Sequence, residues 1–205
     1  MRRFDSVSRS SVVLLGPLLS LVYSLSAQTH YFPPQAFCRP GETKHCEKWY
    51  VPHLQAMREP SLWDLSKSTS AESYRFLWLR TFHHPVSARL DVAGDGAGEL
   101  VVKVLSGAGG YNPGHLIQNR RIKVSKESVD HFLELLNKAD FWNVPTEPEL
   151  GGVGCDGAQW IIEAAKGGRY HVVDRWSPEE GPYRMAGLFL AINLGGLNPR
   201  YNEVY

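Results

Sequence analysis

Short segments in which apolar and polar residues alternate fill the middle of the chain. Residues 74–81 are aromatic and alternating, and residues 86–93 and 99–105 repeat the two-residue period. A Gly-Asp-Gly tripeptide at 94–96 separates the last two segments, and glycine there permits a tight hairpin turn. Residues 116–124 predict a further strand. The pattern therefore predicts a run of strands that includes one hairpin.

The apolar spacing changes to a helical period in the next segment. Ser125 can cap a helix there, because its hydroxyl accepts hydrogen bonds from the first free backbone N–H groups. One face of this predicted helix is apolar and consists of Val129, Phe132, Leu133, Leu136 and Ala139. The helix is expected to end near residue 139, before an aromatic pair.

A second hairpin gives the clearest local signal in the chain. Residues 159–165 and 170–176 alternate on either side of a diglycine at 167–168. Two adjacent glycines permit the positive φ angles of a two-residue hairpin turn. In the register that this turn imposes, Trp160 lies opposite Arg175.

A final helix is predicted after the second hairpin. The tetrapeptide SPEE at 177–180 has the pattern of a capping box, with serine at the cap and glutamate three residues later. The Gly-Pro pair at 181–182 offers a second start for the same helix. Gly195 can close the helix, and its apolar stripe consists of Met185, Leu188, Phe189 and Ile192.

The element order strand-strand-strand-strand-helix-strand-strand-helix predicts an α+β domain. Hairpins favour a mostly antiparallel sheet of about six strands, with the two helices packed on one face. This domain is expected to span residues 74–205. Residues 28–45 are rich in proline, glycine and polar residues, and residues 46–65 predict short helical pieces that Pro52 and Pro60 interrupt. Residues 28–73 are therefore predicted to be an irregular N-terminal arm with short helical stretches.

The first 27 residues have the features of an export signal. Arginines make the start basic, an apolar run of 14 residues follows at 12–25, and small residues precede a cleavage point after Ala27 or Ser26. The run is shorter than the ~20 residues that span a bilayer as a helix, which favours a cleaved signal over an uncleaved anchor. The mature chain is therefore expected to be periplasmic or secreted, with no membrane span.

Three cysteines bear on the compartment and on the arm. Cys38 and Cys46 flank a loop that contains a Pro-Gly pair, and an exported protein can keep a disulfide, so a Cys38–Cys46 bridge is predicted. A metal site that uses both cysteines with His45 would lack a fourth ligand. Cys155 is left over, and a bridge from it to either of the other two remains open.

Composition and charge narrow the function classes. The 205 residues are 43% hydrophobic and 21% charged, as in an ordinary globular protein, and the formal net charge is +1. Removal of residues 1–27 takes away three arginines and one aspartate and changes the net charge to −1. No block of like charge suggests nucleic-acid binding. The glycine-rich stretch at 106–114 fits neither the dinucleotide fingerprint nor the Walker pattern, so no nucleotide cofactor is expected. No histidine spacing resembles a zinc site, so no metal is expected.

Polar residues gather on the second hairpin and allow a catalytic interpretation. Asp156, Glu163 and Asp174 are candidates to supply a carboxylate pair for acid–base hydrolysis. His171 is a candidate general base. No nucleophile motif such as G-x-S-x-G accompanies these residues. Because cross-strand charge pairs are routine in a sheet with one wet face, the sequence favours a structural role of these residues over a catalytic one.

A binding interpretation uses the same hairpin. The candidates are Trp160, His171 and Arg175 on one side of the hairpin, with His83 and His84 outside it. Aromatic residues that could line a groove for sugars or peptides are Tyr74, Phe76, Trp78, Phe141, Trp142, Trp160 and Trp176. Packing in the core is the more common role of such side chains, and a cation–π contact between Trp160 and Arg175 belongs to that structural interpretation.

Four segments together resemble a family of exported bacterial proteins of unknown function. They are RFLWLRTFHHPV at 75–86, KADFWNVP at 138–145, CDGAQWIIE at 155–163 and GRYHVVDRWSP at 168–178. The resemblance covers residues 46–195 and implies export and an α+β fold, but it brings no catalytic residues with it. The chain is therefore predicted to be an exported domain that binds a protein or a glycan in the cell envelope, with a hydrolase as the alternative.

Overall fold

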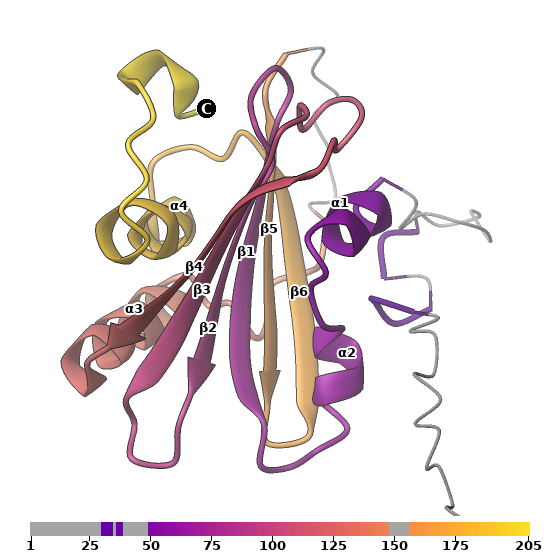
Figure 1. The fold of residues 1–205 in the computed structure, drawn as a ribbon. Helices are drawn as coiled ribbons and strands as arrows, with labels where there is room; N and C mark the ends of the chain where they lie inside the picture. Colours follow the sequence, from indigo (N-terminus) through magenta and orange to yellow (C-terminus); the bar gives the residue numbers. More distant parts are fainter. Residues whose placement is uncertain (1–29, 35, 39–48, 148–155) are drawn as a thin grey trace, which may run out of the picture.

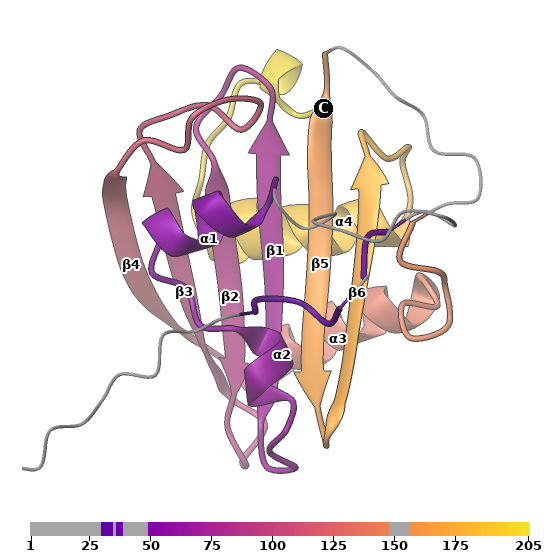
Figure 2. The same cartoon turned by 90° about the vertical axis from the view of Figure 1, so that its right-hand side faces the viewer.

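The computed structural model describes residues 30–34, 36–38, 49–147 and 156–205, and over these residues the chain folds into three layers (Figure 1). A six-stranded antiparallel sheet forms the middle layer. Helices lie on both of its faces, as a view turned by 90° also shows (Figure 2). The predicted α+β class with an antiparallel sheet is therefore confirmed.

The strand order in the sheet is β4-β3-β2-β1-β5-β6, which places the first strand in the middle. The strands are β1 (Glu72–Arg80), β2 (Val86–Val92), β3 (Gly98–Leu105), β4 (Leu116–Val124), β5 (Ala158–Lys166) and β6 (Arg169–Trp176). Each strand begins and ends within two residues of the range that the alternation predicted. The chain crosses from the edge strand β4 back to β5, next to β1, through helix α3 (Lys126–Lys138).

Glycines with positive φ form two of the hairpin turns. Gly96 has a φ of 86° in the turn between β2 and β3. Gly167 and Gly168 have φ angles of 58° and 80° in the turn between β5 and β6, as a two-residue type I′ turn requires. The register of this hairpin places Trp160 opposite Arg175, as predicted.

One face of the sheet is covered by α3, by α4 (Pro182–Leu188) and by the π-helical segment η1 (Phe189–Leu194) that continues α4. Ser125 caps α3 as predicted, because its hydroxyl accepts a hydrogen bond from the backbone N–H of Ser128. A short 3₁₀ turn, η2 (Tyr201–Glu203), follows near the end of the chain.

The core between these helices and the sheet is aromatic. Phe76 and Trp78 of β1 and Trp160 of β5 are completely buried. Their ring centroids lie 5.1 to 5.9 Å from one another. Rings at such distances pack favourably and bury much apolar area, so this cluster anchors β1 and β5 to the helical layer.

The last helix does not begin at the predicted capping box. Ser177 has a φ of 39°, and its hydroxyl accepts a hydrogen bond from the backbone N–H of Ala158 at 3.0 Å. This serine therefore closes one end of β5 instead of capping a helix, and α4 begins at Pro182, the second start that the sequence offered. The predicted apolar stripe is also wrong at Met185, which is 51% exposed, whereas Gly187 faces the sheet.

The other face of the sheet is covered by part of the segment that the sequence predicted to be an irregular arm. α1 (Val51–Ala56), α2 (Leu62–Leu65) and residues 30–34 and 36–38 lie on this face (Figure 2). Pro52 lies in the first turn of α1, where proline is tolerated, so it begins a helix rather than interrupting one. A second core results, made of Tyr31, Phe32, Phe37, Tyr50, Leu54, Met57, Leu77, Leu79, Leu105, Ile161 and Val172.

Some predictions fall on residues outside the described ranges. The leader at 1–27, Cys46 and Cys155 are among them, so export and the Cys38–Cys46 bridge stay predictions. Within the described ranges, no helix combines the length and the apolar character needed to cross a bilayer.

Candidate functional site

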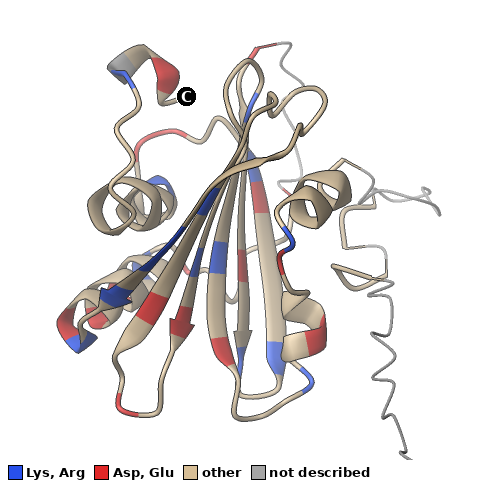
Figure 3. Cartoon of the chain, viewed as in Figure 1, with Lys and Arg blue, Asp and Glu red and all other residues tan. Residues whose placement is uncertain are grey.

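Charged residues occupy the central strands of the sheet as well as its edges (Figure 3). Arg75 of β1 donates from Nε and Nη2 to one oxygen of Glu163 on β5, at 2.9 and 2.6 Å, and the hydroxyl of Tyr170 donates to the other oxygen at 2.9 Å. The side chains of Arg75 and Glu163 have no exposed area. Burial alone would lower the pKa of Arg75, but the attraction of Glu163 and Glu59 outweighs it and raises this pKa, so the arginine stays charged.

Glu59 extends this network to two further strands. Its carboxylate lies 2.9 Å from Nε of Arg89, 2.7 Å from Nζ of Lys103 and 3.6 Å from Nη1 of Arg75. Burial would raise the pKa of Glu59, but the three cations together lower it. Arg75 also donates to the backbone carbonyl of Pro60 at 2.7 Å. The network thus fastens the segment between α1 and α2 to β1, β2 and β3.

A second buried carboxylate, Asp174 of β6, has a separate set of partners. The hydroxyl of Tyr50 donates to its Oδ2 at 2.5 Å. The side-chain amide of Gln159 donates to Tyr50 at 3.0 Å and to the same oxygen of Asp174 at 3.3 Å. Burial raises the pKa of Asp174 to about 7, although the hydrogen bond from Tyr50 acts in the opposite direction.

The three carboxylates considered for a hydrolase have separate partners or surroundings in this geometry. Glu163 is held by Arg75. Asp174 is held by Tyr50, and Asp156 is exposed in the segment just before β5. A glycoside-hydrolysing pair needs two carboxyl groups on either side of one substrate bond. Asp174 instead connects β6 to Tyr50 of the N-terminal segment, and Glu163 connects β5 to Arg75 of β1.

Trp160 was a candidate for contact with a partner, but its side chain is completely buried. Its indole N–H donates to the backbone oxygen of Tyr205 at 2.9 Å. Arg184, rather than the expected Arg175, lies over its ring, 4.9 Å from the centroid. Arg175 lies over Tyr183 instead and donates to main-chain carbonyls of residues 145 and 146. Both candidates therefore support the packing of the hairpin.

The histidine candidates have different partners. Nδ1 of His83 lies 2.7 Å from the hydroxyl of Tyr205, whereas Nδ1 of His84 lies 2.9 Å from a carbonyl oxygen of the glycine-rich loop. Nε2 of His171 lies 3.0 Å from the carbonyl oxygen of Val144. Burial lowers the pKa of His83 and of His171. In the part of the chain that the structure describes, no three potential metal ligands come together.

The glycine-rich loop between β3 and β4 is folded on itself. Backbone N–H groups of residues 106–108 bond to carbonyl oxygens of residues 112–115 across the loop. Those of Gly109 and Gly110 bond to carbonyl oxygens of the connection between β1 and β2. Because these N–H groups already have acceptors, they cannot surround a phosphate, in agreement with the failed phosphate-loop patterns.

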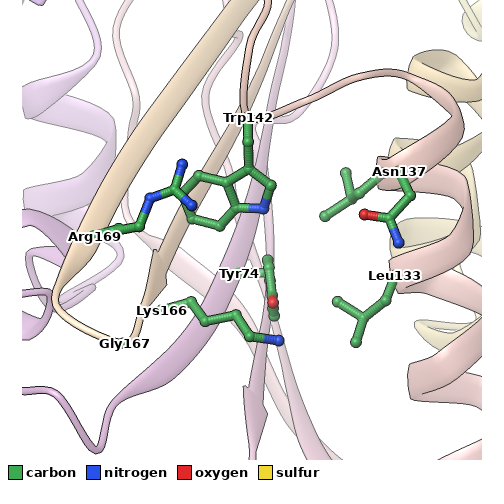
Figure 4. Close-up of a pocket in the computed structure, with 8 residues that line it drawn as sticks. Tyr74, Leu133, Asn137, Trp142, Lys166, Gly167 and Arg169 are labelled. Atoms are coloured by element: carbon green, nitrogen blue, oxygen red, sulfur yellow. The ribbon is translucent and has the colours of Figure 1, made fainter.

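An open cleft of about 340 Å³ lies between α3 and the turn that joins β5 to β6 (Figure 4). It is lined by Tyr74, Leu133, Leu136, Asn137, Trp142, Lys166, Gly167 and Arg169. The leucines and the aromatic rings form apolar walls, whereas the side chains of Asn137, Lys166 and Arg169 are exposed at the rim. We call this site the α3 cleft.

The polar groups of the α3 cleft are rich in hydrogen-bond donors. The guanidinium of Arg169 lies over the ring of Trp142, 4.7 Å from its centroid. The nitrogen side of the Trp142 ring is turned toward Asn137 (Figure 4). The ammonium group of Lys166 donates to the carboxylate of Glu72 at 2.8 Å. Among the lining residues that the structure describes, none is acidic.

Sequence reasoning found only part of this site. Tyr74 and Trp142 were among the aromatic residues considered for a groove, and they do line the α3 cleft. Lys166 and Arg169, which flank the diglycine turn, were not considered for a site. Two cations that flank a two-residue turn are a signal that could have drawn attention to this end of the hairpin, because opposite residues of an antiparallel pair share a face.

Comparison with known proteins adds no family to this picture. No protein-family model and no curated protein matches the chain. The resemblance to exported bacterial proteins remains a prediction from the sequence. The geometry of the described residues is therefore the basis for assigning a function.

Proposed function

We propose that this chain is an exported domain of the cell envelope that binds a glycan in the α3 cleft. One observation carries the proposal: the cleft joins apolar walls, among them Trp142 and Leu133, to exposed polar groups at its rim. A sugar presents an apolar ring face together with hydroxyl groups, so it needs both kinds of surface. Small-ligand sites are built in this way, from apolar walls and a few placed polar groups.

The size and the charge of the α3 cleft support a small polar ligand. Its volume of about 340 Å³ is near the lower end of the range of small-molecule sites, about 300–1,000 Å³. A concave site of this size suits one or a few sugar residues better than the flat surface of a folded protein. The described residues that line the cleft include no acidic side chain, which supports binding rather than acid–base hydrolysis.

Replacing Trp142 with alanine is expected to weaken glycan binding about tenfold, which corresponds to ~1.4 kcal/mol. The indole forms one wall of the cleft and also supports Arg169, so its loss removes apolar contact and a positioned donor. Co-sedimentation with insoluble bacterial envelope glycan, followed by calorimetric titration with its soluble fragments, measures the change.

The matched control for this prediction is Trp49→Ala. Trp49 is 47% exposed and does not line the cleft, so its removal should leave glycan binding unchanged. Circular dichroism of both variants checks that each has folded. Equal loss in the two variants, or no binding by the unmodified protein, would contradict the proposed function.

We also infer that residues 1–27 direct export to the periplasm or the cell exterior, and that Cys38 and Cys46 are joined there. Intact-mass measurement of protein purified from the envelope fraction should give a chain that starts at Gln28. Reduction should add the mass of one pair of hydrogens, because a disulfide takes up two hydrogens when it opens. A cytosolic product that retains its basic start would contradict export, and free thiols at both cysteines would contradict the bridge.

A further inference from the structure

We propose that the ligand of the α3 cleft is an acidic sugar, one whose ring carries a carboxylate. This inference rests on the proposed glycan binding and specifies the class of sugar. It is carried by two cations and two neutral donors that line one cleft in which no described residue of the lining is acidic. A site with this set of groups favours an acceptor that is itself negatively charged.

The two cations come from opposite sides of one turn. Lys166 ends β5 and Arg169 begins β6, and the two residues are direct partners in the register of the hairpin. Both are exposed and both line the cleft. The indole of Trp142 lies beside Arg169, and the amide of Asn137 lies across the cleft on α3 (Figure 4). Both groups can donate to hydroxyl groups.

The ring of Trp142 holds the guanidinium of Arg169 in place but does not neutralise its charge. The ring of Trp142 lies 4.7 Å from its guanidinium and limits the orientations that the side chain adopts. Among the described residues, no carboxylate forms an ion pair with it. A guanidinium that is held in this way can donate two parallel hydrogen bonds to one carboxylate. Arg169 is therefore the group that recognises the acid.

Lys166 is restrained by an acidic neighbour outside the cleft. Its ammonium group lies 2.8 Å from Glu72, whose side chain also accepts a hydrogen bond from the hydroxyl of Tyr74 at 2.8 Å. Glu72 thus offsets part of the positive charge that Lys166 brings to the cleft. Glu72→Gln keeps an acceptor for Tyr74 but removes this offset, so it should strengthen the binding of an acid.

The test uses the full mature chain and follows the indole N–H resonance of Trp142 by NMR, assigned with a Trp142→Phe variant. D-glucuronate, D-glucose and inorganic phosphate are titrated separately. D-glucuronate is expected to bind about tenfold or more tightly than D-glucose, because a charge-assisted hydrogen bond discriminates by roughly that factor. Phosphate alone should bind more weakly than D-glucuronate, because it has no sugar ring.

Three variants test which residues produce the preference for D-glucuronate. Arg169→Gln should abolish the preference for D-glucuronate over D-glucose, and Glu72→Gln should increase the affinity for D-glucuronate several-fold. Arg121→Gln removes an exposed arginine of β4, the opposite edge strand, and should change neither affinity. An increase caused by Glu72→Gln is not expected if these residues have only a structural role.

The outcomes separate this inference from the function on which it rests. Equal affinities for D-glucose and D-glucuronate would overturn the acidic-sugar inference and leave glycan binding intact. Phosphate binding as tight as D-glucuronate would also overturn it, because the cleft would then recognise a bare anion. If neither sugar shifts the Trp142 resonance and envelope glycan does not bind, the proposed function itself fails.

Discussion

Replacing Arg75 with methionine is expected to lower the free energy of unfolding by about 3–5 kcal/mol. The substitution keeps a long side chain, but it leaves Glu163 and Glu59 buried without the guanidinium that now lies beside them. A buried charge that loses its partner destabilises a fold far more than the intact pair stabilises it. Urea unfolding followed by tryptophan fluorescence measures the change.

The matched control for this prediction is Arg121→Met. Arg121 pairs with Glu99 across β3 and β4, but the two side chains are 64% and 44% exposed. An ion pair this exposed contributes only about 0–1 kcal/mol. The double variant Arg75→Met/Glu163→Met should recover part of the loss, because it removes both members of the buried pair. If Arg75→Met destabilises the fold no more than Arg121→Met does, the buried network does not hold the N-terminal segment to the sheet.

The same network explains what the sequence could and could not predict about the sheet. Arg75, Arg89 and Lys103 alternate with apolar residues on β1, β2 and β3, and this period of two located the strands correctly. The polar face of the second hairpin was interpreted as wet, which is wrong, because Glu163 and Asp174 are buried. The three cations on the neighbouring strands are buried on the same face, beneath the N-terminal segment. A polar position that faces water and one that faces buried carboxylates have the same pattern in a sequence.

Sequence motifs failed to predict the structure where a contact between residues far apart in the chain determined it. Ser177 has the sequence context of a helix cap, yet its hydroxyl bonds to the backbone of Ala158 on the neighbouring strand. The α3 cleft depends likewise on the packing of Trp142 against Arg169, which are far apart along the chain. Neither contact has a periodic signal, so both become visible only when the strands are placed beside one another.

Asp174 makes the stability of the fold depend on pH in the direction opposite to that of an ion-paired carboxylate. Burial raises its pKa from 3.8 to about 7, against the hydrogen bond from Tyr50 and the weaker attraction of Arg175. Between about pH 4 and pH 7, the folded protein therefore keeps on Asp174 a proton that the unfolded chain has already released. The contribution of Asp174 to stability is complete below about pH 4, falls as the pH rises, and is lost above about pH 7.

Above about pH 7, Asp174→Asn is therefore expected to be more stable than the unmodified protein, by up to about 4 kcal/mol in the free energy of unfolding. Near about pH 4 the two proteins should be equally stable. Asparagine keeps an acceptor for the hydroxyl of Tyr50 and carries no charge. Urea unfolding of both proteins from about pH 4 to pH 8 gives the difference in their free energies of unfolding at each pH. The contributions of the other titrating groups cancel in this difference, because both proteins contain them. Asp130→Asn, at an exposed carboxylate of α3, is the matched control. A difference for Asp174→Asn that stays constant across this range would mean that Asp174 ionises as readily in the fold as in the unfolded chain.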